Sequence, residues 1–342
     1  MPARLIITNG DAAVARLREA GIEAEFLPWR DPLHDGPAPA GLVLEALSLI
    51  RAQFLARELG HSLIDVMQQF AARDASARNH HQFERVDLWF EHDLYDQLQL
   101  IQLLNFFAAE NRLEGVFLIE AADYLATEPV TSLRGLGAAA APVNAARMET
   151  GRRAWAAFTA SSPEKLGEFA ATEGRALPHL APALRRLIRE LPAIASGLSL
   201  TEERVLNVLS AGQQTVHQLF TKIQAQEEAR FLGDILFFRR LDRLAFAPQP
   251  LIAGLEFEST RCARGANAPD YRAYAEARVR LTDIGRAALA GRFDHAAENG
   301  IDRWLGGTHV TPKTMWRRDQ HGRLAMPPKG QPNPSHDSPA RA

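Results

Sequence analysis

Residues 86–107 constrain the fold of this chain more than any other stretch. Their sequence, VDLWFEHDLYDQLQLIQLLNFF, starts with a short apolar run and ends in a long apolar helical pattern. Four ionisable residues stand between the two: Glu91, His92, Asp93 and Asp96. The pattern predicts a buried strand followed by a buried helix. Because ionisable groups are costly to bury without a partner, their junction is the first place to look for chemistry.

The first 122 residues repeat the order strand, then helix. Further strands are predicted at 5–8, 25–29 and 115–120, and a long helix at 41–73. Strands that alternate with helices favour a parallel sheet. The expected fold class is therefore α/β, with an N-terminal Rossmann-like domain over residues 1–122.

The remaining chain changes character twice. Residues 123–198 are rich in Ala without strand patterns, which predicts a helical connector. Over 199–295, three helices are followed by strands at 247–257 and 278–281, and this order is typical of a winged-helix domain. Residues 296–320 are expected to form a C-terminal strap, and the Pro-, Ser- and Gly-rich residues 321–342 a disordered tail.

Polar residues follow three of the four predicted strands. In an open parallel sheet the ligand crevice lies outside the carboxyl ends of the strands, so we expect these residues to converge. The candidate catalytic residues are Asp11, Asp31, His34, Glu91, His92 and Asp93. The candidate ligand-binding residues are Asn9, Gly10, Trp29, Asp96 and Gln97.

Each candidate also has a purely structural interpretation. Asp11 and Asp93 stand where a helix needs an N-cap, and an acid in the first turn favours the helix dipole. Asp31 and His34 lie in a turn bracketed by prolines, where Asp commonly bonds its own backbone. His92 is explained equally well as a surface histidine.

Two kinds of chemistry suit this set of residues. Carboxylates around Mg²⁺ or Mn²⁺ support hydrolysis or transfer at phosphate, whereas carboxylates and a histidine without metal act as acid and base on a polar substrate. The sequence leaves the metal unassigned. It contains neither the dinucleotide fingerprint nor the P-loop motif, so no nucleotide cofactor is expected. The motifs HExxH and GxSxG are also absent.

The winged-helix segment suggests a second class of function. Its third helix carries Arg239, Arg240 and Arg243, which are candidates for contacts with DNA phosphates. However, the segment holds 13 Arg and Lys residues against 12 Asp and Glu, and DNA-binding modules are usually more basic. A role in dimerisation or as a scaffold is the alternative. Residues 304–309 are expected either to cover the polar site or to dock the winged helix.

The composition limits location and partners. The net charge is −2, which favours neither nucleic acid nor an anionic membrane. The single cysteine, Cys262, excludes an internal disulfide and a cysteine zinc site. No apolar run is long enough to span a bilayer, and the N-terminal run is too short for a secretion signal. We expect a soluble cytoplasmic protein without a membrane partner.

The chain resembles a bacterial family known as domain of unknown function 1835, followed by that family's own C-terminal domain. The resembling blocks are Thr8–Asp11, Trp29–Asp31, Leu33–Pro37, Leu88–Asp93, Asp96–Gln97, Gly197–Ser199, Thr201–Glu202 and Trp304–Gly307. They span most of residues 4–319. The resemblance implies no activity, because the family has none assigned. Ala12 departs from the Ser of many relatives, which argues against a hydroxyl group acting beside Asp11.

Three hypotheses follow. The leading one is an acidic site, catalytic or ligand-binding, for a small polar or phosphorylated molecule and with a divalent metal as its cofactor. The second is a ligand-sensing winged-helix regulator that binds DNA. The third is a non-catalytic interaction protein, for which a homodimer is one arrangement.

Overall fold

The computed structural model describes residues 4–172 and 175–326. Its largest sheet has the strand order β2-β1-β4-β5-β6, and all neighbours are parallel except β5 and β6. The strands and the helices between them are β1 (Arg4–Thr8), α1 (Asp11–Glu19), β2 (Glu25–Pro28), β4 (Arg85–Glu91), α4 (Leu94–Ala109), β5 (Val116–Ala121) and β6 (Ala141–Pro142). The predicted α/β fold class is confirmed.

The sheet is covered on both faces. On one face Ile6, Trp89 and Ile119 pack with α1 and α5 (Val130–Ala138). On the other face the alternate residues pack with α4, which is itself covered by α6 (Ala145–Phe158) and α8 (Leu180–Ile188). Burial on both sides explains why β4 is an unbroken apolar run and why α4 has no polar face.

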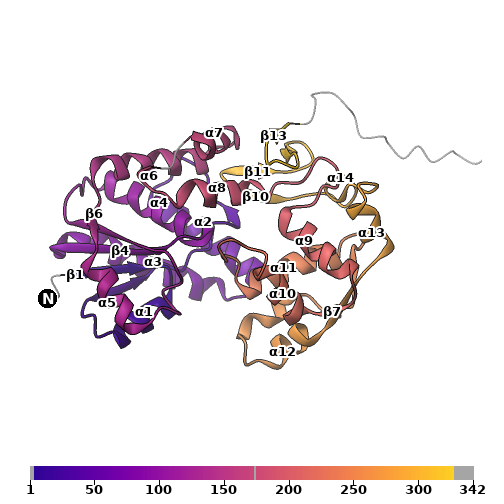
Figure 1. Ribbon diagram of the computed structural model, residues 1–342, viewed down its shortest axis with the longest axis horizontal. Coiled ribbons are helices and arrows are strands. Elements are labelled where there is room, and N and C mark those ends of the chain that lie inside the picture. Colours follow the sequence, from indigo (N-terminus) through magenta and orange to yellow (C-terminus); the bar gives the residue numbers. More distant parts are fainter. Residues whose placement is uncertain (1–3, 173–174, 327–342) are drawn as a thin grey trace, which may run out of the picture.

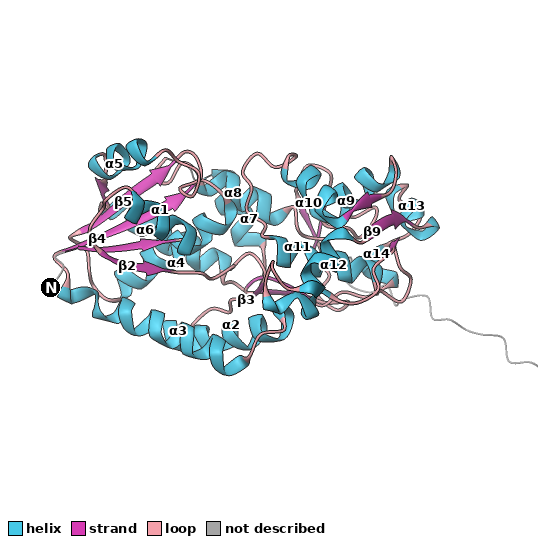
Figure 2. Cartoon of the chain, turned by 90° about the horizontal axis from the view of Figure 1, so that it is seen from below, coloured by secondary structure: helices cyan, strands magenta, loops and turns pink. Residues whose placement is uncertain are grey.

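The helix predicted over 41–73 is wrong as a single element. The structure has two helices, α2 (Leu44–Leu59) and α3 (Leu63–Arg78), which lie side by side in Figure 2. Gly60 ends α2 with a φ of 69°, and Ser62 caps α3 by accepting a hydrogen bond from the Asp65 amide. A Cβ at Gly60 would lie 2.4 Å from the Thr260 carbonyl oxygen, so the position needs glycine.

The predicted connector forms part of the sheet's covering layer. It contains α5, β6, α6, α7 (Glu164–Thr172) and α8. The short strand β6 was not predicted, because it has two residues and includes Pro142 at the sheet's edge. α6 packs closely on α4 at Gly151, where a Cβ would lie 2.5 Å from that of Leu104.

Residues 199–289 have the predicted winged-helix order. The elements are α9 (Leu200–Ser210), β7 (Gln214–Thr215), α10 (Val216–Gln224), α11 (Asp234–Ala245), β8 (Ile252–Ala253), β9 (Arg278–Leu281) and α13 (Asp283–Leu289), with the strands in antiparallel order β7-β9-β8. The predicted capping box between Ser199 and Glu202 is formed.

The strand predicted over 247–257 is reduced to two residues. The chain then forms a 3-10 turn, η2 (Ser259–Arg264), and a short helix, α12 (Pro269–Glu276), where the sequence suggested a loose loop. Tyr274 explains this difference. Its buried hydroxyl donates to Asp242 Oδ1 at 2.7 Å and lies 3.1 Å from the Phe238 carbonyl oxygen, which fastens α12 to α11.

The C-terminal strap ties the two halves together. It contains α14 (His295–Glu298), β10 (Arg303–Gly306), β11 (Thr308–Val310), β12 (Arg317–Arg318) and β13 (Leu324–Ala325). β10 pairs in parallel with β3 (Gly36–Pro37), and the amide of Gly307 donates to the Phe158 carbonyl. Cβ atoms at Gly306 and Gly307 would lie 2.1 and 1.8 Å from backbone oxygens of 158 and 159. The paired glycines therefore permit close docking on α6.

Two expectations about the C-terminus have different outcomes. The disordered tail was placed at 321–342, but Leu324–Ala325 pairs with Arg317–Arg318 as a hairpin, so that part is wrong. Residues 327–342 lie outside the described residues. None of the helices in the described ranges is long and apolar enough to cross a membrane.

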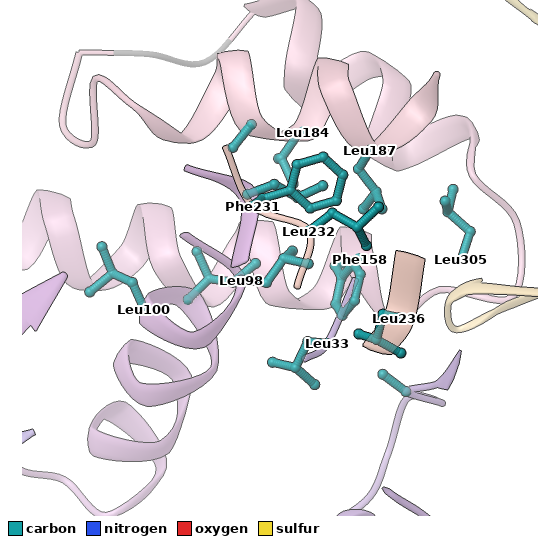
Figure 3. Packing of buried hydrophobic residues seen from close by; sticks show 14 of the residues in the cluster. Leu33, Leu98, Leu100, Phe158, Leu184, Leu187, Phe231, Leu232, Leu236 and Leu305 are labelled. Atoms are coloured by element: carbon teal, nitrogen blue, oxygen red, sulfur yellow. The ribbon is translucent and has the colours of Figure 1, made fainter. Parts of the chain in front are cut away.

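An apolar seam joins the winged-helix half to the α/β half. Figure 3 shows Phe231, Leu232 and Leu236 against α8 and the core beneath it. Beside this seam lies a buried ion-pair network centred on Arg240, which contacts Asp35 at 3.3 Å and Glu190 at 3.5 Å. The two halves are therefore held by both apolar packing and buried charge.

Candidate functional site

The carboxyl ends of β1 and β4 meet at the point where the strand order reverses. From β1 the chain moves to β2 on one side, and from β4 it moves to β5 on the other. The loops that follow β1 and β4 therefore diverge at this switch point, which is the usual ligand position in open α/β sheets. They carry Asn9–Gly10 and His92–Asp93.

Three buried carboxylates converge at this switch point. Glu91 is the last residue of β4, Asp93 is the N-cap of α4, and Asp96 is the third residue of that helix. One oxygen from each lies within 4.8 Å of the others. The strand-to-helix junction produces this geometry, because a cap and the third helical residue share one side of the first turn. We call these three residues the acidic cluster.

Neutral donors hold the acidic cluster. Asp96 accepts from the Glu91 amide at 2.7 Å and from Asn9 Nδ2 at 2.9 Å. Asp93 Oδ1 accepts from the amides of Tyr95 and Asp96, and Glu91 Oε1 accepts from the Leu125 amide at 2.8 Å. Within the described residues, no Lys, Arg or His forms an ion pair with the acidic cluster.

Burial raises the pKa of all three acids. Desolvation is the largest cause in each case, and the neighbouring carboxylates add to it for Asp93 and Asp96. The pKa of Asp93 reaches about 7. Carboxyl groups this close do not all ionise near neutral pH, so the acidic cluster retains protons there. A cation that enters would displace them.

Asn9 and Gln97 donate hydrogen bonds to the acidic cluster and its backbone. Gln97 Nε2 donates to the Glu91 carbonyl at 2.7 Å, and its buried Oε1 has no hydrogen-bond partner among the described residues. Gly10 is the N-cap of α1, so the interpretation of Asp11 as that cap is wrong. The structure thus brings Asn9 and Gln97 to the acidic cluster, as predicted.

Asp11 lies apart from the acidic cluster. Its side chain is 69% exposed and pairs with Arg30, whose Nη2 is 2.5 Å from Asp11 Oδ1. The ion pair also lowers the Asp11 pKa through the hydrogen bond from Arg30. Arg30 has a φ of 58°, which is uncommon for a residue other than glycine, and its amide donates to the Asn9 carbonyl. This pair links the start of α1 to the loop that follows β2.

Asp31 and Trp29 belong to a buried structural layer under α2 and α3. Asp31 is fully buried, and its Oδ1 is 2.8 Å from Arg51 Nη2. Trp29 Nε1 donates to Gln102 at 2.7 Å, and the guanidinium of Arg73 lies 4.2 Å from the Trp29 ring. Neither residue belongs to the acidic cluster. The prediction that both converge on one site with the acids after β4 is therefore wrong. The cause is two arginines later in the chain, Arg51 and Arg73, which lie against the Asp31 carboxylate.

His34 is buried in the same layer. Its ring packs edge-on against Phe231 at 5.1 Å, and both ring nitrogens lack a hydrogen-bond partner among the described residues. Desolvation, followed by Arg240, lowers the His34 pKa to about 3. The histidine is therefore neutral at physiological pH.

Replacing His34 with Phe tests this assignment. The wild-type folded state rejects a proton that the unfolded state accepts below pH 6.5, so His34 reduces stability as the pH falls from 6.5 toward 3. The variant should lose about 1.4 kcal/mol less free energy of unfolding per pH unit in this range. Urea titrations at pH 6.5 and 5 measure the difference. An unchanged slope would mean that His34 is protonated in the folded protein.

A cleft of about 720 Å³ adjoins the acidic cluster. It lies between the loops after β4 and β5 and the helix α10 with the turn that follows it. Its lining residues are His92, Ala122, Asp123, Tyr124, His217, Phe220, Thr221, Gln224, Ala225, Glu227, Glu228 and Arg230. His92 connects the two features, because it lies between Glu91 and Asp93 in the chain. A volume in this range fits a small molecule.

His92 faces this cleft rather than the acidic cluster. Its ring centroid is 5.4 Å from that of Tyr124 and 6.0 Å from that of His179. Desolvation and the nearby His179 lower the His92 pKa, so it is a neutral donor or acceptor. The sequence prediction missed Tyr124 and Arg230. Tyr124 could have been found as the polar end of the fourth strand, whereas nothing in the sequence relates Arg230 to the sheet.

The three arginines suggested for DNA are engaged by carboxylates. Arg240 is buried against Asp35 and Glu190, and Arg239 and Arg243 both lie 3.3 Å from Glu58 on α2. α11 therefore turns these side chains toward the α/β half. The arrangement gives no support to phosphate contacts by Arg240, and DNA binding stays a prediction.

Comparison with protein-family models and with curated proteins gives no match for this chain. The resemblance to domain of unknown function 1835 therefore also stays a prediction.

Proposed function

We propose that the acidic cluster binds a divalent cation, Mg²⁺ or Mn²⁺, and through it a small phosphorylated or otherwise polar molecule in the adjoining cleft. The ion pairs that neutralise buried acids elsewhere in the described chain are missing here, and the acids are held by neutral hydrogen-bond donors alone. Three carboxylates that share a 4.8 Å space with neutral donors form a ligand set for a hard cation.

The position of the acidic cluster supports the same proposal. It lies at the switch point of the sheet, beside a cleft large enough for a small molecule. A bound divalent cation would polarise a phosphate or carbonyl oxygen of that molecule. Asn9 and Gln97 orient the carboxylates by hydrogen bonds to Asp96 and to the backbone of Glu91.

Titration with Mn²⁺ tests the proposal. At a metal concentration 100 times the dissociation constant, the wild-type protein should gain about 2.7 kcal/mol in free energy of unfolding. The gain should disappear in Glu91→Gln and in Asp93→Asn, and it should persist in the control Glu23→Gln, which changes an exposed acid outside the site. The readout is the increment on adding metal at pH 8, measured by thermal or urea unfolding.

The magnetic resonance signal of free Mn²⁺ gives an independent count of bound ions. One site per chain is expected in the wild-type protein and none in the two cluster variants. Equal binding by wild-type and Asp93→Asn proteins would overturn the proposal.

A further inference from the structure

Arg230 is a cation in the cleft that no carboxylate among the described residues neutralises. The other arginines near this corner are paired: Arg186 and Arg204 both contact Glu227, at 2.7 and 2.5 Å. Within the described residues, Arg230 contacts Tyr124 and no carboxylate. A guanidinium left without an anion in a cleft is a group that a ligand can satisfy.

The position of Arg230 is fixed from both sides. Its guanidinium lies 4.5 Å from the centre of the Tyr124 ring, and its backbone amide donates to the Tyr124 hydroxyl at 2.5 Å. The next two residues, Phe231 and Leu232, are buried in the seam between the two halves, where Figure 3 shows them beside Leu184 and Leu187. The arginine therefore belongs to the winged-helix half but is anchored against the sheet's edge.

Tyr124 connects this arginine to the acidic cluster. It follows β5, its ring contacts that of His92 at 5.4 Å, and its pKa is raised by burial, with a smaller contribution from the charge of Asp93. His92 stands between Glu91 and Asp93 in the chain. A ligand held by a metal at the acidic cluster would thus extend past His92 toward Arg230.

We propose that Arg230 binds the phosphate group of the ligand across the cleft from the metal, with Tyr124 as its positioning residue. This inference rests on the function proposed above and specifies its ligand as a phosphate ester. The rigid fork of a guanidinium matches two phosphate oxygens, and a divalent cation prefers the same hard oxygens. The remainder of the ester would lie along α10, beside Phe220, Thr221 and Gln224.

Because the cleft is negatively charged, we expect phosphate binding to require bound metal. Asp123 and Glu228 are exposed on its lining, and the acidic cluster lies behind His92. These carboxylates repel an anion until a cation neutralises part of their charge. Phosphate should therefore bind after the metal and weakly without it.

The test uses inorganic phosphate as the probe on the full chain, with and without saturating Mg²⁺. Isothermal titration should show phosphate affinity about 10-fold to 100-fold lower in Arg230→Gln than in the wild-type protein, in the range expected for hydrogen bonds to a charged group. Arg292→Gln, which removes an exposed arginine outside the cleft, is the matched control and should bind as the wild type does. Acetate at the same ionic strength should not compete.

The Tyr124→Phe variant separates positioning from structural support. It keeps the ring under the guanidinium and removes the hydroxyl that accepts the Arg230 amide. Its phosphate affinity should fall, while the double variant Tyr124→Phe/Arg230→Gln should bind no more weakly than Arg230→Gln alone. Additive losses in the double variant would overturn the positioning role.

The failures of the two proposals are distinguishable. If Mn²⁺ binds at the acidic cluster and Arg230→Gln leaves phosphate affinity unchanged, the inference about Arg230 is overturned and the metal site stands. If Mn²⁺ does not bind, the proposed function fails. Phosphate affinity is then compared without metal, and a loss in Arg230→Gln would still support an anion site at Arg230. If acetate displaced the bound phosphate, the inference that the ligand is a phosphate ester would be overturned.

Discussion

Replacing Asp31 with Asn should destabilise the protein by about 3–5 kcal/mol, the usual cost of removing one partner from a buried ion pair. Asp31 and Arg51 are both fully buried, and Arg51 also donates to the carbonyl oxygens of Pro32 and Asp35. Without the carboxylate, the guanidinium would remain in the core without a counterion. Urea unfolding at pH 7 measures the loss.

Asp11→Asn is the control for this experiment. It also removes the acid of an Asp–Arg pair beside the same sheet edge, but that pair is solvent-exposed. Exposed pairs contribute about 0–1 kcal/mol, so little change is expected. If Asp31→Asn instead proved nearly neutral and abolished Mn²⁺ binding, Asp31 would belong to the metal site and the structural assignment would be wrong.

The contrast between Asp31 and Asp93 shows where a single sequence is sufficient to predict the role of a residue and where it is not. Both follow a strand of the parallel sheet, and both have turn or cap interpretations. The residues that distinguish them are Arg51 and Arg73, which lie 20 and 42 positions after Asp31 on two later helices. Their pairing depends on how α2 and α3 pack, which no local pattern encodes.

Local patterns did predict the elements that carry the site. The apolar run before Glu91 and the cap at Asp93 specify a strand and a helix start within a few residues of each other, so the acidic cluster could be anticipated. The order of winged-helix elements was equally accessible, because each helix has its own apolar face and capping residues.

Non-local pairings were the part that sequence patterns could not supply. The two residues of β3 become a strand only because β10 pairs with them from 269 positions later, and β6 exists only as an edge partner of β5. Arg230 is the functional example. It gains its proposed role by packing against Tyr124, a contact between residues 106 positions apart.

Replacing Asp93 with Asn should increase stability above neutral pH. The folded-state pKa of Asp93 is raised to about 7 from 3.8, so the folded protein holds a proton that the unfolded chain releases between these values. Stability is therefore lost as the pH rises from 3.8 to 7, by about 1.4 kcal/mol per unit. Asn keeps the N-cap and cannot ionise, so the variant avoids this loss.

The expected gain for Asp93→Asn is about 4 kcal/mol at pH 8 and near zero at pH 4, because wild-type Asp93 stays protonated there. Urea unfolding at both pH values, without metal, measures it. Mn²⁺ at 100 times its dissociation constant should narrow this difference by about 2.7 kcal/mol, since the ion stabilises the wild-type protein and has no complete ligand set in the variant. A variant that is less stable at both pH values would identify Asp93 as a structural cap. A gain that metal narrows is instead what a binding site predicts, because its carboxylates are kept at a cost to stability for the ligand they receive.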